Sequence, residues 1–166
     1  MNKKIGKLIV MMFGIGLVKY FPGTFASFVT ALVYCFFYTI KLNYLLLILI
    51  NLFLFIYSVW MINNLEGEFA EIDSKEIVID EFLGQSIPIL FFYIIFYEGS
   101  VSNNFFFIIV FLSFVGFRFF DIFKPYPINY VDKNMKNGFG VVLDDLIAGF
   151  FTLIVLYICI IFYGQI

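Results

Sequence analysis

Two pairs of adjacent acidic residues, Asp80-Glu81 and Asp144-Asp145, interrupt a chain that is otherwise strongly apolar. Each pair lies where a long apolar run begins, and carboxylates there are costly unless they are solvated, paired with cations or bound to metal. Mg²⁺ prefers carboxylate and water oxygens. The pairs therefore predict a divalent-metal site. Two simpler interpretations stay open: a helix dipole favours acidic residues in a first turn, and each pair can merely neutralise a nearby Lys or Arg.

A third charged segment, at residues 117–124, contains residues of both signs. If it is helical, Arg118 and Asp121 lie on one face, and Lys124 follows three residues beyond Asp121. The helix should end at Lys124, because the residue before a proline disfavours the helical conformation. The segment therefore gathers one acidic and two basic residues near the end of a predicted helix.

Two glycine-containing segments are expected to form turns. A Pro-Gly pair precedes the first long apolar run, and Thr24 and Ser27 are suited to cap the helix that follows. Free N–H groups at a helix start can bind phosphate, although a plain capped helix is the simpler interpretation. Gly138 and Gly140 predict a flexible turn before the last apolar run.

Residue types that the chain lacks exclude several kinds of catalysis. His is absent, so acid–base chemistry must use carboxylates, Lys, Tyr or metal-bound water, and a phosphohistidine route is excluded. No Cys-x5-Arg loop offers a thiol nucleophile, and no Asp-x-Asp-x-Thr or Asp-x-Asp-x-Val segment supports an aspartyl phosphate. The net charge of -2, without a basic face, argues against a nucleic-acid partner.

The elements that must position these residues are predicted to be membrane helices. Hydrophobic residues make up 63% of the 166 residues and charged residues 13%, with a mean hydropathy of +1.03, a balance typical of membrane proteins. The length suits one domain, and we expect a single all-α membrane domain over residues 1–166. The charge-free runs disfavour the alternative of a soluble helical protein. Residues 8–18 are too short to span and predict an interfacial or half-span helix. The spans are expected at residues 23–40, 44–62, 82–97, 105–117 and 146–163.

The distribution of Lys and Arg predicts the orientation of these spans. With the N-terminus in the cytoplasm, every basic residue except Lys41 lies on the cytoplasmic side. The same orientation puts every acidic residue except Glu98 on that side. Acidic residues contribute little to topology, so their gathering needs another cause. Chemistry at the cytoplasmic face is the interpretation we favour.

Taken together, these segments resemble the phosphatidylglycerophosphatase A family. Its Pro-Gly-Thr-x-Gly-Ser, Asp-Glu-x-x-Gly, Phe-Arg-x-x-Asp-x-x-Lys-Pro-x-Pro-Ile and Gly-Gly-x-Gly-x-x-x-Asp-Asp-x-x-Ala-Gly segments correspond in order to residues 22–27, 80–84, 117–128 and 137–149. Ala26 and Asn137 stand where the family has Gly. These departures affect the shape of two loops and remove no charged group.

The resemblance implies Mg²⁺-dependent hydrolysis of phosphatidylglycerophosphate to phosphatidylglycerol and phosphate, at the cytoplasmic face of a bacterial inner membrane. Metal-activated water is the favoured nucleophile, and direct attack by a carboxylate stays open as an alternative. A homodimer is also possible for such a small helical bundle. The expected catalytic and metal-binding residues are Asp80, Glu81, Asp121, Asp144 and Asp145, and the expected phosphate-binding residues are Arg118, Lys124, Thr24 and Ser27.

Other functions fit the sequence less well. Another Mg²⁺-dependent lipid phosphomonoesterase is the nearest alternative. A phosphoalcohol transferase would carry a long Asp-Gly…Ala-Arg…Gly…Asp…Asp helix pattern, which no segment matches. A small ion transporter would place charged residues near the bilayer midplane and often contains internal repeats, whereas the acidic residues here are expected at one interface.

Overall fold

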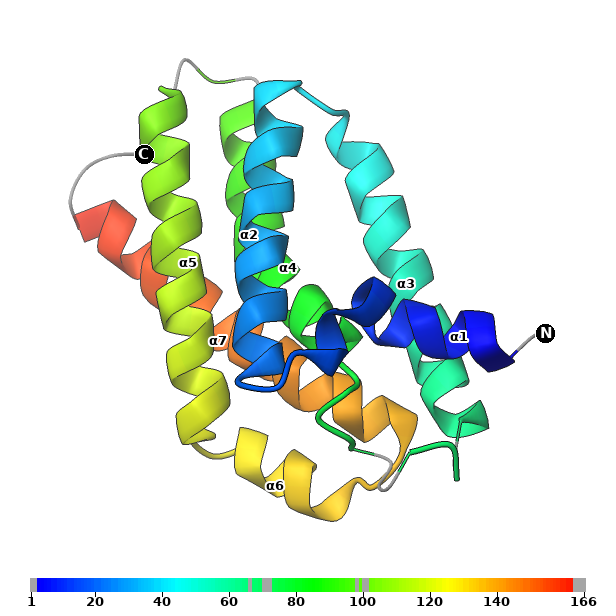
Figure 1. The fold of residues 1–166 in the computed structure, drawn as a ribbon. Helices are drawn as coiled ribbons and strands as arrows, with labels where there is room; N and C mark the ends of the chain where they lie inside the picture. The colour runs from blue at the N-terminus through cyan, green and yellow to red at the C-terminus, as the bar shows by residue number, and fades with distance from the viewer. Residues whose placement is uncertain (1–2, 66, 70–72, 98, 100–101, 163–166) are drawn as a thin grey trace.

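The computed structural model describes residues 3–65, 67–69, 73–97, 99 and 102–162, and this part of the chain is helical and contains no strand. Figure 1 shows α2, α4 and α5 standing side by side, with α7 passing obliquely across them and α6 lying at one end of the bundle. The elements are α1 (Lys3–Val10), the 3-10 helix η1 (Met12–Leu17), α2 (Pro22–Thr39), α3 (Tyr44–Asn64), α4 (Ile79–Tyr97), α5 (Asn103–Phe123), α6 (Ile128–Asn134) and α7 (Gly138–Phe162).

Five of these helices, α2, α3, α4, α5 and α7, are long and apolar enough to cross a membrane. They confirm the predicted all-α membrane bundle. Helix α4 lies at its centre: 61% of its apolar window is buried inside the protein, against 22% to 39% for the other four. Ile89, Phe92 and Tyr93 of α4 are fully buried. The remaining helices turn apolar side chains outward, as a lipid environment requires.

The last helix begins earlier than the sequence indicated. Gly138 and Gly140 form the first turn of α7, so the predicted flexible turn is wrong. The backbone N–H of Gly138 donates to Asn63 Oδ1 at 2.7 Å, and that of Gly140 donates to Asn137 Oδ1 at 2.8 Å. These bonds satisfy N–H groups that a helix start leaves free. Asp144-Asp145 consequently lies about 9 Å inside the helix, rather than at its start.

The start of α2 also differs from the prediction that side chains cap it. The helix begins at Pro22, a favoured residue type for a first position, and the preceding Phe21 is left-handed (φ 54°) and makes no side-chain cap bond. Thr24 and Ser27 lie inside the first two turns, and Ser27 Oγ donates to the carbonyl of Gly23 at 2.9 Å. The two hydroxyls are therefore free of any capping role.

The N-terminal segment supports the start of α4. Helix α1 lies across the bundle (Figure 1), and the Val10 carbonyl accepts a hydrogen bond from Val78 N at 3.0 Å. Gly16 of η1 lies against the carbonyl of Glu76, where a Cβ would collide with the backbone. Residues 76–78 directly precede α4, so these two contacts fix the position of its first turn, which carries Asp80 and Glu81.

Candidate metal and phosphate site

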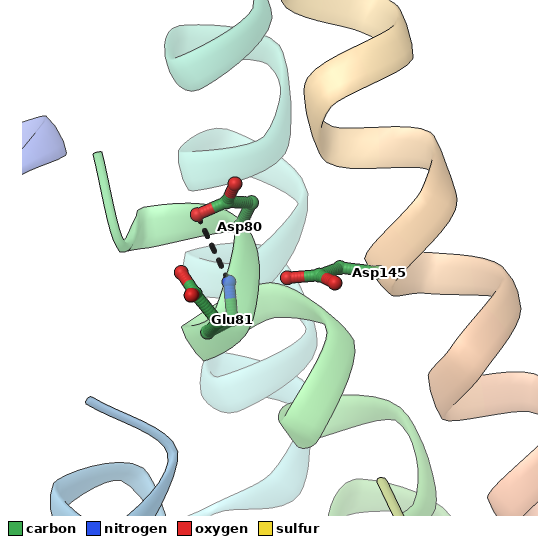
Figure 2. Close-up of side chains that lie close together, drawn as sticks. All are labelled: Asp80, Glu81 and Asp145. Atoms are coloured by element: carbon green, nitrogen blue, oxygen red, sulfur yellow. Dashed lines mark hydrogen bonds between the residues drawn. The ribbon is translucent and has the colours of Figure 1, made fainter. Parts of the chain in front are cut away.

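Three carboxylates from two helices meet at one point. Asp80 and Glu81 belong to the first turn of α4, and Asp145 belongs to α7. One oxygen of each lies within 4.8 Å of the others, and Figure 2 shows the side chain of Asp145 pointing toward the pair. Asp80 and Asp145 are only 7% and 5% exposed. Two of the three carboxylates are therefore largely shielded from solvent, and Glu81 is half-buried.

Two glycines let α4 and α7 approach closely enough for this meeting. A Cβ at Gly84 would stand 2.5 Å from the carbonyl oxygen of Asp145, and one at Gly149 would overlap the carbonyl of Gly84. Both obstacles are backbone atoms, which cannot rotate away as a side chain does. Small residues at a helix crossing allow such contact. The crossing therefore holds Asp145 beside the first turn of α4.

Glu81 joins the cluster to the start of α2. Its backbone N–H donates to Asp80 Oδ1 at 3.1 Å. Its Oε1 lies against Gly23, leaving no room for a side chain there, and its Oε2 is buried without a hydrogen-bond partner among the described residues. The Pro-Gly segment thus gives Glu81 space at the start of α2, which the sequence did not indicate.

Arg118 of α5 lies beside this contact. Its Nη1 bonds to Asp121 Oδ2 at 2.7 Å, one turn along the same helix, and to Ser27 Oγ at 3.4 Å. Asp121 in turn interacts electrostatically with Glu81 and Asp145. Arg118, Asp121 and Ser27 therefore border the three carboxylates, and Thr24, half-buried, lies in the first turn of α2.

Asp144 and Lys124 form a separate contact. The Nζ of Lys124 bonds to Asp144 Oδ2 and to Asp132 Oδ1, each at 2.8 Å. Lys124 has a left-handed backbone (φ 42°) at the end of α5, so the chain turns away from the face of Asp121. Burial lowers the pKa of Lys124, but its two carboxylate partners outweigh that effect and raise the pKa above the usual value. Asp144 is thus paired with a cation outside the three-carboxylate cluster.

Comparison with known proteins identifies the kind of protein that carries this site. The family model of phosphatidylglycerophosphatase A matches residues 8–160. The chain belongs to this family. The match confirms the resemblance found in the four sequence segments, and it makes the chain a lipid phosphatase of the phosphoric monoester hydrolase class.

Individual members of the family and a related protein are similar to the chain along most of their length. Phosphatidylglycerophosphatase A of Haemophilus influenzae is 29% identical over 150 residues, covering 90% of this chain and 85% of that protein. The Escherichia coli protein of the same name is 29% identical, with 90% and 80% covered. A Bacteroides thetaiotaomicron protein provisionally named phosphatidylinositol-3-phosphatase is 31% identical over 153 residues, with 90% and 89% covered. No solved structure matches the chain.

The residues of the carboxylate cluster fit a divalent cation. Three neighbouring carboxylates repel one another, and ionised carboxylates can only accept hydrogen bonds. A cation beside the buried and unpaired Glu81 Oε2 would relieve this repulsion, and hard divalent ions bind carboxylate oxygens. The acidic group of Asp80, Glu81 and Asp145 can hold such an ion.

The sequence did not indicate one charged residue near the site, and it gave a glycine there too simple a role. Asp132 of α6 was not singled out, because only the fold shows that it shares Lys124 with Asp144. The sole local signal is an acidic residue in a short polar stretch that follows Lys124. Gly23 was interpreted as a turn residue, whereas its contact with Glu81 is tertiary.

Proposed function

We propose that the chain hydrolyses the terminal phosphomonoester of phosphatidylglycerophosphate to phosphatidylglycerol and inorganic phosphate, with Mg²⁺ held by Asp80, Glu81 and Asp145. The observation that carries the proposal is the meeting of these carboxylates beside Arg118, in a chain of this family. A cation next to acidic metal ligands is what binding of a dianionic phosphate requires.

The residues of the chain have distinct parts in this reaction. Arg118, kept in place by Asp121 and Ser27, holds the phosphate, and its bidentate guanidinium suits two phosphate oxygens. The start of α2, with Thr24, adds N–H groups that favour an anion. When bound, Mg²⁺ supplies Lewis-acid polarisation of the phosphoryl group and lowers the pKa of the attacking water. Water attacks phosphorus and gives up a proton, the bond from phosphorus to the lipid oxygen breaks, and the leaving oxygen takes up one proton, so that water is the only reactant consumed.

Asp121 and the pair of Asp144 with Lys124 support the site in this proposal. Asp121 borders the carboxylate cluster and can join it as a ligand if Arg118 turns to the substrate. Lys124 is engaged by Asp144 and Asp132, so its part as a phosphate ligand requires a change of partner. Arg118 is accordingly the first phosphate-binding residue that we propose, and Lys124 the second.

We place this activity at the cytoplasmic face of a bacterial inner membrane. The support is the bias of Lys and Arg to the side of the chain that also carries Asp80, Glu81 and Asp145. A headgroup at the bilayer surface reaches this end of the bundle while its acyl chains stay among the lipids. The substrate therefore need not leave the membrane.

A phosphoinositide monophosphate is the second candidate substrate. The specific observation in its favour is the relative provisionally named phosphatidylinositol-3-phosphatase, which is at least as similar as the two phosphatidylglycerophosphatases. Both lipids present a phosphomonoester on a hydroxylated headgroup. The cation and carboxylates described above act on the phosphate, so an assay of several headgroups must decide between them.

The test is phosphate release by the purified protein from phosphatidylglycerophosphate, phosphatidylinositol 3-phosphate and phosphatidic acid, each with Mg²⁺ or with a chelator. We expect the first lipid to be the best substrate, and chelation to abolish turnover until Mg²⁺ is restored. Asp145→Asn should lower turnover about a hundredfold or more, because a metal ion contributes several kcal/mol to the transition state.

The matched control is Glu68→Gln, which removes an exposed carboxylate that pairs with Lys3, away from the cluster. It should leave turnover unchanged. Metal-independent hydrolysis, or near-normal turnover in the Asp145→Asn protein, would contradict the proposed site. A preference for phosphatidylinositol 3-phosphate would change the proposed substrate and leave the proposed metal site unaffected.

A further inference from the structure

Gln85 of α4 is a buried polar residue that the proposed reaction does not use. It is 0% exposed, although α4 is a candidate membrane span. Within the part of the chain that the structure describes, neither its amide nitrogen Nε2 nor its amide oxygen Oε1 has a hydrogen-bond partner. Buried polar side chains are normally hydrogen-bonded, so this amide requires an explanation.

Gln85 lies on the same face of α4 as Glu81, one turn further into the bundle. Residues four apart in a helix differ in direction by only about 40°, because each residue adds about 100°. Their Cβ atoms are about 5–6 Å apart, which is within the reach of two long side chains. The amide of Gln85 can therefore meet the carboxylate of Glu81 without any movement of the backbone.

Glu81 Oε2 is an acceptor that suits this amide. It is buried, and none of the described residues bonds to it. An ionised carboxylate only accepts hydrogen bonds, and the amide nitrogen of Gln only donates them. Arg118 Nε is a second buried donor without a described partner, but Arg118 is already bonded to Asp121 and Ser27 and is the proposed phosphate ligand. Gln85 has no such competing role.

Ser113 of α5 can complete the bonding of the amide. Its hydroxyl is fully buried and also lacks a partner among the residues that the structure describes. Helix α5 runs antiparallel to α4 (Figure 1), and a Cβ at Gly84 would stand 2.7 Å from Phe117 Cε2. Ser113 lies four residues before Phe117, so it faces α4 about one turn deeper than this contact. At that depth its O–H can donate to Gln85 Oε1.

We infer that Gln85 is a positioning residue of the metal site, which donates to Glu81 Oε2 and accepts from Ser113 Oγ. The inference rests on the proposed function, because it assigns the group that orients one of the proposed Mg²⁺ ligands. A carboxylate held at one oxygen presents the other to the cation in a fixed direction. The amide is neutral, so it holds Glu81 without competing with the cation for its charge. Hydrogen bonds of this kind to a metal ligand typically contribute about 10–100-fold to metal affinity.

The first experiment measures Mn²⁺ binding to the purified protein in detergent micelles, without substrate, from the electron paramagnetic resonance signal of free Mn²⁺. Gln85→Met replaces the amide by an apolar side chain of similar length and should raise the Kd for Mn²⁺ about tenfold or more. Ser58→Ala is the matched control. It also removes a fully buried hydroxyl without a described partner, but from α3, which carries none of the candidate ligands. It should leave the Kd unchanged.

The outcomes separate this inference from the proposed function. A rise in Kd of less than about threefold in a folded Gln85→Met protein overturns the inference and leaves the metal site in place. If the wild-type protein binds no Mn²⁺, the metal site and the inference both fail. If it binds Mn²⁺ but releases phosphate from no lipid, the proposed activity fails, and the Kd of Gln85→Met still decides whether Gln85 supports the cation.

The second experiment requires no substitution at Gln85. The chain contains two glutamines, Gln85 and Gln165, so a Gln165→Ala protein labelled with nitrogen-15 at glutamine gives one pair of side-chain amide resonances. Addition of Mg²⁺ should shift this pair, because the cation fixes the carboxylate that accepts from the amide. Ser113→Ala should shift it as well, and Ser58→Ala should not. Resonances that stay in place at Mg²⁺ concentrations that displace Mn²⁺ from the protein overturn the inference.

Discussion

Asp144 and Asp145 are adjacent in the chain, yet their carboxylates have different partners. Asp145 faces Asp80 and Glu81, whereas Asp144 is bonded to Lys124, which also binds Asp132 of α6. The position of Lys124 between two acidic residues ties α6 to α7. One member of the pair is therefore available as a metal ligand, and the other holds the end of the bundle together.

Substitutions of Lys124 and Asp144 test this division at the residue scale. Lys124→Met leaves a mostly buried Asp144 without its cation and should lower the free energy of unfolding by about 1–3 kcal/mol. Asp144→Asn removes that unpaired charge, so the double variant should recover part of the loss, with a coupling of about 1 kcal/mol. Unfolding in detergent micelles measures all three proteins.

The exposed pair of Lys3 and Glu68 is the control for this cycle. Lys3→Met and Glu68→Gln, singly and together, should change the free energy of unfolding by about 0.5 kcal/mol or less, because solvent screens an exposed ion pair. Strict additivity of Lys124→Met and Asp144→Asn would show that the two residues do not depend on each other.

At the scale of elements, the crossing of α4 and α7 decides whether the site exists. Gly84 and Gly149 bring the two backbones into contact one turn away from the acidic residues. The N-terminal segment supports the same region from the other side through Val10 and Gly16. The first turn of α4 is therefore held from both sides, by α7 after it and by the N-terminal segment before it, and the site depends on both contacts.

Gly149→Ala should separate these helices. Its new Cβ meets the carbonyl of Gly84, which cannot move without its helix, so overpacking should cost about 1–3 kcal/mol of stability and lower turnover as well. Gly116→Ala is the comparison variant, because its Cβ would meet a side-chain methyl group, Thr152 Cγ2 at 2.9 Å, rather than backbone atoms. The measurement is unfolding in micelles together with phosphate release. Equal stability of the two variants would refute a backbone contact at Gly149.

At the scale of the whole molecule, the bundle is polar at one end. The starts of α2 and α4, the end of α5 and the short α6 gather at that end. The end of α2, the start of α3, the end of α4 and the start of α5 lie at the opposite end (Figure 1). The acidic cluster is close to the first end, where lipid headgroups would lie. This polarity suits a reaction at one surface of the membrane.

The proposed orientation can be tested by labelling single cysteines. Cys35 and Cys159 are free thiols and are first replaced by Ser. Asn103→Cys, at the start of α5, should then react with a membrane-impermeant thiol reagent in intact cells, because it lies at the end opposite the acidic cluster. Lys133→Cys, on α6, should react only after the cells are opened. The reverse pattern would place the carboxylates outside the cytoplasm.

The sequence by itself determined the helical membrane class, the order of five spans and the family. These features depend on local information: an apolar run must satisfy its backbone hydrogen bonds internally, so its length predicts a spanning helix wherever it later packs. The end of α5 at Phe123 also follows from Pro125, two residues further on. Acidic pairs next to apolar runs are likewise visible in the sequence, and they supplied the candidate metal ligands.

Only the tertiary structure decided which of those candidates meet. The start of α7 at Gly138 depends on a hydrogen bond to the side-chain amide of Asn63 in α3. The space for Glu81 depends on the absence of a side chain at Gly23 in α2. Asp144 and Asp145 point to different partners because successive residues of a helix differ in direction by about 100°. Which direction faces a partner depends on how α4, α6 and α7 pack, and that is not encoded by any one segment.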